Sequence, residues 1–309
     1  MAAERTPMDE ARPIPADWLS LREPADAQAR QITRADVSDL VGTYRPEVII
    51  DVGSGTGAGA RWVASCLDGD ERWVLIDHDQ ALLGTAAAGL RRAGVEAEIT
   101  EVLDDLSCLG DVLDEVRAEG GSALVITSAL LDLLTEPQLA DLLDVVAVRR
   151  VPLIAALTVT GGLVAEPSDP VDELIREAFD AHQRHGDRLG PDAVERTQQL
   201  ALARGIPVRA VPTPWRLSAS ASAQQTELMA RLLRDRAEAA GEELRHRDDR
   251  RGLTTVQDWL QRRLHQLDLG ALHLQIDHTD LFLPAATHVY PKSVQNPSSI
   301  GTGFPTDFG

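Results

Sequence analysis

The order of apolar and polar residues along the chain predicts an alternation of strands and helices. A short apolar run at 47–51 indicates a buried parallel strand, and runs of the same kind follow at 72–77, 96–102, 122–127 and 152–158. Between them, apolar residues recur at helical spacing over 58–67, 80–93, 112–118 and 137–147. Strands that alternate with helices of this length are typical of βαβ units, so we expect a parallel sheet covered by helices.

The pattern changes after residue 158. Two helices, 170–184 and 191–204, precede a sixth strand at 208–217, in which Pro212 and Pro214 predict a sheet edge or an early exit from the ladder. Helices at 227–245 and 254–267 lead to a last strand at 271–282, where polar and apolar residues alternate. Near the beginning, 17–30 and 33–41 have helical spacing. The composition of 1–16 and of the tail 286–309 predicts poorly ordered ends.

Charge and cysteine content narrow the classes of partner. The chain of 309 residues carries 49 acidic and 30 basic side chains, a net charge of −19, which argues against nucleic acid as a partner. We interpret the Arg-rich stretch 231–263 as a solvated helix face with i,i+4 ion pairs. Cys66 and Cys108 are isolated, which suits a reducing cytoplasm. The N-terminus shows no signal-peptide pattern, and no apolar run is long enough to span a membrane.

The most informative stretch is Ile-Asp-Val-Gly-Ser-Gly-Thr-Gly at 50–57, which follows the first strand and opens a helix. Glycines permit a positive φ and close approach of a ligand to the backbone. The N-terminus of the following helix offers free N–H groups and a favourable dipole. The loop is therefore expected to hold a ligand at the carboxyl end of the first strand.

Two features bear on which ligand this is, because Gly53-x-Gly55-x-x-Ala58 also satisfies the dinucleotide fingerprint. Asp51 would repel a pyrophosphate but suits the ammonium group of an amino acid. With Gly57 the pattern becomes DxGxGxG, which resembles motif I of class I S-adenosylmethionine-dependent methyltransferases. The resemblance implies that Asp51, Gly53, Ser54, Gly55 and Gly57 surround the methionine part of that cofactor.

The same resemblance implies the fold and the domain organisation. It predicts a Rossmann-like, doubly wound α/β sheet of seven mostly parallel strands with an antiparallel last strand. Residues 1–44 would form an N-terminal segment with cap helices. The catalytic domain would span 45–285, with a helical insertion at about 166–205, and the tail would follow.

Further cofactor contacts are expected at the ends of the next strands. Asp77 ends the second strand and is expected to accept hydrogen bonds from ribose hydroxyls, a geometry that NAD enzymes and methyltransferases share. Asp79 is expected to be a helix N-cap, and His78 either covers the adenosine or is an exposed loop residue. The remaining candidates follow the third and fourth strands: Leu103, Asp104 in competition with Glu101 for the adenine amine, and Ser128.

Candidate acceptor residues are less well defined. The segment 127–134 is similar to motif IV of the family, in which Asp132 either orients a substrate hydroxyl or amine, or caps a helix or faces solvent. Segments at 18–26, 178–184 and 214–217 resemble an actinobacterial-type branch of small-molecule-like methyltransferases. We expect the helices of 170–204 and the helix around Trp18 to form a lid over the substrate, with Phe179 and His182 facing inward. The alternative is that they pad the sheet.

The sequence therefore predicts methyl transfer from S-adenosylmethionine to a small molecule by in-line displacement, in the cytoplasm. Asp132, His182 and His185 are weak candidates for a general base. His182 and His185 lack further ligands, so we expect no metal site. An NAD(P)-dependent oxidoreductase and a non-catalytic S-adenosylmethionine-binding protein remain as alternatives. The acceptor, the methylated atom and the oligomeric state are not predicted.

Overall fold

A computed structural model describes residues 15–67 and 69–286, and its centre is a twisted sheet of eight strands. The sheet order is β3-β2-β1-β4-β5-β8-β6, with β7 also paired to β8. Strands β1 to β5 run parallel and β8 runs antiparallel to β5. The strands are β1 Val48–Val52, β2 Arg72–Asp77, β3 Ile99–Leu103, β4 Ala123–Ser128, β5 Leu153–Glu166, β6 Arg209–Pro212, β7 Trp215–Ser218 and β8 His273–Leu283. The predicted Rossmann-like arrangement with an antiparallel last strand is confirmed.

The strand count differs from seven because the predicted sixth strand is interrupted. β6 ends at Pro212 and β7 begins at Trp215, and both pair with β8. Between them Pro214 has no N–H to donate to a ladder. Thr213 donates its N–H to the carbonyl of His278 at 2.8 Å. The two prolines therefore mark a sheet edge, as predicted, and also divide the strand.

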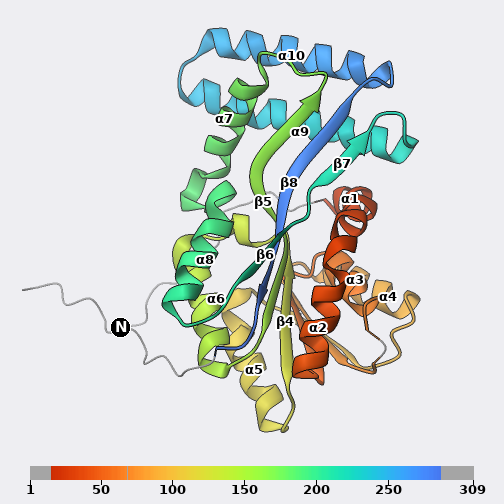
Figure 1. Ribbon diagram of the computed structural model, residues 1–309, viewed down its shortest axis with the longest axis vertical. Coiled ribbons are helices and arrows are strands. Elements are labelled where there is room, and N and C mark those ends of the chain that lie inside the picture. The colour runs from red at the N-terminus through yellow and green to blue at the C-terminus, as the bar shows by residue number, and fades with distance from the viewer. Residues whose placement is uncertain (1–14, 68, 287–309) are drawn as a thin grey trace, which may run out of the picture.

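Alternate residues of the central strands point to opposite faces of the sheet, and helices cover both. Val48, Ile50 and Val52 of β1 join one apolar core with α5, α6 and α8, whereas Ile49 joins the other with α2, α3 and α4. Figure 1 shows these helices on either side of the sheet. Their bounds are α2 Arg34–Tyr44, α3 Ala58–Ala64, α4 Gln80–Arg92, α5 Leu109–Ala118, α6 Glu136–Arg149 and α8 Ala193–Ala203. α8 packs in the core of the sheet, as the alternative of padding predicts, and a lid role of 191–204 stays a prediction.

A third core lies beyond the carboxyl edge of the sheet. There β5, β7 and β8 pack against α1, α7, α9 and α10, a unit that we call the helical module. Figure 1 shows β5 and β8 running from the sheet into this module. Its helices are α1 Ala16–Ala29, α7 Asp172–Gln183, α9 Ala223–His246 and α10 Arg250–Asp268. β5 is therefore twice as long as the run at 152–158 predicted, because it serves two cores.

The pairing of β5 with β8 contains a bulge. Val159 pairs with His278 and Leu163 with Ile276, so β5 takes four steps (159 to 163) where β8 takes two (278 to 276). Gly161, within the two-residue excess, has φ 83°. Bulges of this kind bend a strand and are frequent beside active sites.

The interpretation of the Arg-rich stretch 231–263 as a wholly solvated face is wrong at two positions. Arg236 on α9 and Arg263 on α10 are 3% and 0% exposed. Both turn into the helical module, although the charge pattern of their helices gives no sign of it. Within the described residues, no helix combines the length and the apolar character that crossing a membrane requires.

Candidate functional site

The glycine loop at 53–57 joins β1 to α3 at the carboxyl edge of the sheet. Gly53, Gly55 and Gly57 have φ of 67°, 53° and 77°, which favour glycine. A Cβ on Gly53 or Gly55 would lie 3.2 Å from the flexible side chain of Leu130 or Leu19, respectively. These leucines can shift, so the backbone of this half of the loop can become accessible to a ligand.

Gly57 has a different neighbour. A Cβ there would lie 2.8 Å from the Cβ of Ala86 and 2.9 Å from its Cα, which belongs to the rigid helix α4. The third glycine of the motif thus allows α4 to pack closely against the loop. It supports the loop through packing, whereas its two predecessors lie under side chains that can move.

Asp51 lies beneath the loop and is 1% exposed. Its Oδ2 has no hydrogen-bond partner within residues 15–67 and 69–286. Burial, reinforced by the negative charge of Asp77, raises the pKa of Asp51 to about 7. The hydroxyl of Ser54 is likewise buried and unpartnered in the described part of the chain. Buried polar atoms without partners are costly, so both are suited to meet polar groups of a ligand.

Asp77 holds the loop to the end of β2. Its carboxylate accepts hydrogen bonds from the backbone N–H of Gly55 at 2.8 Å and of Asp79 at 3.0 Å. The remaining lone pairs of the carboxylate leave room for further donors. His78 is exposed, and Asp79 caps α4 by accepting from Ala81 and Leu82, as predicted. The structure therefore gives Asp77 a role in shaping the loop that sequence reasoning missed.

The residues after β3 lie at the surface. Leu103 and Asp104 are exposed, and the N–H of Asp104 donates to the carbonyl of Asp77 at 3.1 Å. The competing Glu101 accepts from Gln80 on α4 at 3.3 Å. Asp104 is thus the acidic residue that this loop places beside Asp77, and its contact with an adenine remains a prediction.

Asp132, in the short 3-10 helix Leu131–Leu133 after β4, is buried and does not face solvent. Its Oδ1 has no hydrogen-bond partner among the residues described. Burial raises the pKa of Asp132 to about 6, although the backbone N–H groups of Asp132 and Val159 and the charges of Arg22 and Arg188 act in the opposite direction. Ser128, at the end of β4, lies against Gly59 of α3. With a pKa of about 6, the Asp132 carboxylate is mostly ionised at neutral pH yet can accept a proton.

Helix α1 covers the glycine loop. Leu19 packs over Gly55, and Arg22, one turn later, lies over the Trp215 ring at 5.1 Å. Trp18 stacks under Arg231 of α9 at 5.1 Å and so lies in the contact between α1 and α9. Its contact with the substrate stays a prediction.

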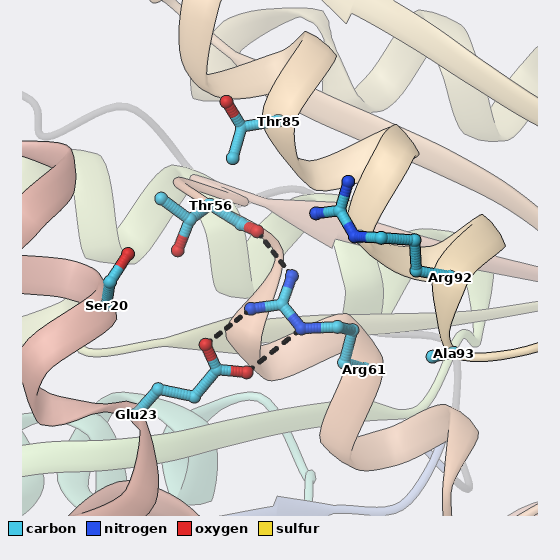
Figure 2. A pocket seen from close by; sticks show the side chains of 8 residues that line it. Ser20, Glu23, Thr56, Arg61, Thr85, Arg92 and Ala93 are labelled. Atoms are coloured by element: carbon cyan, nitrogen blue, oxygen red, sulfur yellow. Dashed lines mark hydrogen bonds and ion pairs between the residues drawn. The ribbon is translucent and has the colours of Figure 1, made fainter.

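A cavity of about 350 Å³ adjoins the loop on its outer side, between α1, α3 and α4. In Figure 2, Arg61 points toward Glu23 and toward the carbonyl of Thr56. The Arg61–Glu23 pair has N···O distances of 2.9 and 2.6 Å, and it ties α1 to α3 beside the loop. No local pattern could reveal this pair, whose partners are 38 residues apart.

The predicted lid residues of α7 face α9. Phe179 lies under the guanidinium of Arg236, 4.1 Å from ring centre to Cζ. His182 and His185 pair with Glu242 and Glu243 at 2.9 and 2.7 Å. The part of the chain that the structure describes contains no cluster of three metal-binding side chains. The histidines thus link two helices, and the contact of His182 with the substrate stays a prediction.

The known proteins that are similar to this chain include methyltransferases. No family model matches the chain. It is similar to a caffeoyl-CoA O-methyltransferase from Stellaria longipes, with 25% identity over 172 residues, which cover 55% of this chain and 70% of the relative. Among solved structures, it is similar to a cyclopropane synthase from Mycobacterium tuberculosis at 13% identity and a TM-score of 0.40, over 80% of this chain and 83% of that one. It is also similar to the O-methyltransferase TomG from Streptomyces achromogenes, at 13% identity and a TM-score of 0.43, over 85% and 89%. The match to a methyltransferase sequence agrees with the resemblance at residues 51–57.

Proposed function

We propose that the protein is an S-adenosylmethionine-dependent methyltransferase that acts on a small molecule. The observation that carries the proposal is the glycine loop, with the unpartnered carboxylate oxygen of Asp51 below it and Asp77 at the end of the neighbouring strand. The similarity of the chain to a caffeoyl-CoA O-methyltransferase supports the same proposal. The loop is less suited to a dinucleotide, because the Asp51 carboxylate would oppose a pyrophosphate.

The residues present fit the cofactor. Asp51 and Ser54 offer polar atoms to its amino acid part, and Gly53 and Gly55 allow close approach once Leu130 and Leu19 shift. Asp77 would bind the ribose with the lone pairs that the loop leaves free. When bound, S-adenosylmethionine supplies a methyl group that is activated as part of a sulfonium.

The chain's own contribution would be positioning, exclusion of water and, for an acceptor that must lose a proton, a base. Holding the reactants in place can supply effective molarities of about 10⁵ M or more. Helix α1 would close the site above Gly55. Asp132 would hold the proton, since its pKa of about 6 lies near neutral pH.

The compartment and the partners form a separate part of the proposal. We infer a cytoplasmic location from the two cysteines Cys66 and Cys108, which are not joined in a disulfide and suit a reducing compartment. The net charge of −19 opposes binding of a phosphate backbone.

The test is calorimetry and thermal unfolding with S-adenosylhomocysteine and NAD⁺ as separate ligands. We expect S-adenosylhomocysteine to bind and to raise Tm, because a ligand that binds the native state alone stabilises it. NAD⁺ is expected to have no effect. Stabilisation by NAD⁺ with no response to S-adenosylhomocysteine would instead favour an oxidoreductase and refute the proposal.

A further inference from the structure

Four buried polar side chains come from β5 and from three elements around it, and one of them, Asp180, lies against the bulge. Asp132 follows β4, Thr158 lies in β5, Asp180 in α7 and Arg236 in α9, and we call this set the β5 polar cluster. Each is at least nine-tenths buried, and each carries one or two polar atoms without a hydrogen-bond partner in residues 15–67 and 69–286. Such atoms are rare in native proteins, and several of them along one strand segment call for an explanation.

Arg236 is the cation of the cluster. Its Nε and Nη1 atoms lack partners among the described residues, and one face of its guanidinium lies over Phe179. Burial lowers the pKa of Arg236 to about 10, which leaves it charged at neutral pH. Arg263, the other buried arginine of the module, differs: it donates to Asp172 and, at 2.6 Å, to the carbonyl of Pro167. The module therefore gives both Nη atoms of Arg263 partners and leaves only its Nε without one in the described residues, whereas Arg236 lacks partners at Nε and Nη1.

Asp180 is the neighbouring anion. Its Oδ2 accepts from Arg176 at 3.0 Å, but Oδ1 is buried and has no partner in the described part of the chain. The bulge brings it close to the backbone, because a Cβ on Gly161 would lie 2.8 Å from Oδ1. Arg236 is near enough to Asp180 for each charge to shift the pKa of the other. Arg236 lies over Phe179, the residue before Asp180, so donors without acceptors and an acceptor without a donor come from neighbouring positions of the α7–α9 contact.

The cluster adjoins the glycine loop. The backbone of Val159, at the start of the bulge, is near enough to Asp132 to lower the pKa of its carboxyl. Two residues before Asp132, Leu130 packs over Gly53. The cluster therefore leads from the carboxyl edge of the sheet, where α/β folds bind ligands, into the helical module.

We infer that the β5 polar cluster binds the acceptor, and that the acceptor is a small amino acid or hydroxy acid. Its carboxylate meets the guanidinium edge of Arg236, and its amino or hydroxyl group donates to Oδ1 of Asp180. Stacking on Phe179 leaves the in-plane N–H groups of Arg236 for a planar partner, which a carboxylate matches. That the bound acid is the methyl acceptor rests on the proposed function, whereas the binding of the acid to the β5 polar cluster does not.

The experiment measures thermal unfolding and calorimetric binding with the twenty L-amino acids, lactate, malate and mandelate, each beside its uncharged amide. It is done with and without S-adenosylhomocysteine. We expect at least one acid to raise Tm while its amide does not. Arg236→Met and Arg236→Lys should each weaken its binding about 10- to 150-fold, the equivalent of one charge-assisted hydrogen bond. Arg234→Met, at an exposed position of the same helix, should bind as the wild type does.

Stability without ligand separates binding from a structural role. Arg236→Met should keep or raise Tm, because it replaces an unpartnered buried charge with an apolar side chain. Arg263→Met should lower Tm, because it removes the guanidinium bonds to Asp172 and to the carbonyl of Pro167. If Arg236→Met lowers Tm as much as Arg263→Met does, Arg236 is a structural residue bridged by water and the inference is wrong. If no acid binds although S-adenosylhomocysteine does, the inference fails and the proposed function stands. If an acid binds but S-adenosylhomocysteine does not, the inference about the acid site stands and the proposed function fails.

Discussion

The packing of Gly57 against α4 leads to a quantitative prediction for Gly57→Ala. The backbone there has φ 77°, and placing an L-residue in the left-handed region costs about 1–2 kcal/mol. The new Cβ would also lie 2.8 Å from the Cβ of Ala86 and 2.9 Å from its Cα. Overpacking of this kind costs about 1–3 kcal/mol. The free energy of unfolding should therefore fall by roughly 2–5 kcal/mol.

Urea unfolding followed by tryptophan fluorescence measures this change, because Trp62 and Trp73 are buried in the core on that side of the sheet. Gly84→Ala is the matched control on α4. A Cβ there would meet no atom within 4 Å, so helix propensity alone should raise stability by about 0.5–1 kcal/mol. If Gly57→Ala changes the free energy of unfolding by less than about 1 kcal/mol, the close contact with Ala86 does not support the loop as argued.

Three further predictions concern the loop and its carboxylates. Asp51→Asn should stabilise the protein by roughly 2–4 kcal/mol at pH 8 and by progressively less toward pH 4 in urea unfolding. The reason is that the pKa of Asp51 is raised in the folded protein. Its contribution to the free energy of unfolding is fully present below the unfolded pKa of 3.8 and is lost as the pH rises through about 7, whereas an asparagine does not ionise. Asp77→Asn should lower the affinity for S-adenosylhomocysteine about 10- to 150-fold in calorimetry, and an unchanged Kd would show that it does not contact the ligand. Gly55→Val should abolish that binding in a folded variant, since φ 53° and the approach of the ligand both exclude a β-branched side chain.

The parts of the fold that the sequence predicts well are those with a local cause. Strand β2 has the predicted bounds, because a continuous apolar run ends in Asp77 and a capping Asp79. The left-handed turns of the glycine loop follow in the same way from three glycines after a buried strand. The end of β5 has no such signal, since Gly161 and Gly162 interrupt its pattern and suggest a turn where the strand bulges instead.

The candidate site was only partly predictable, for a related reason. Asp132 lies within a leucine-rich segment, whose pattern alone does not show whether the carboxylate is buried. Arg236 has Asp235 and Glu238 close by in sequence, but its neighbours at helical spacing, Leu232, Leu233, Ala239 and Ala240, are apolar and place it on the buried face of α9. An interpretation of the stretch by its charges overlooks that signal. The contact of Arg236 with Phe179, more than fifty residues away in the sequence, leaves no trace in a local pattern.

The position of β8 constrains how the protein can be made. Leu281 and Leu283 belong to one face of the sheet, Phe282 to the other, and Leu274 and Ile276 to the helical module, so the last strand contributes to all three cores. A nascent chain cannot complete any of these cores until this strand has left the ribosome. Until then the long edge of β5 has no antiparallel neighbour and is open to pairing with other chains. Synthesis should therefore depend on chaperones that shield this edge, and a chain terminated before residue 273 should aggregate rather than fold into a smaller domain.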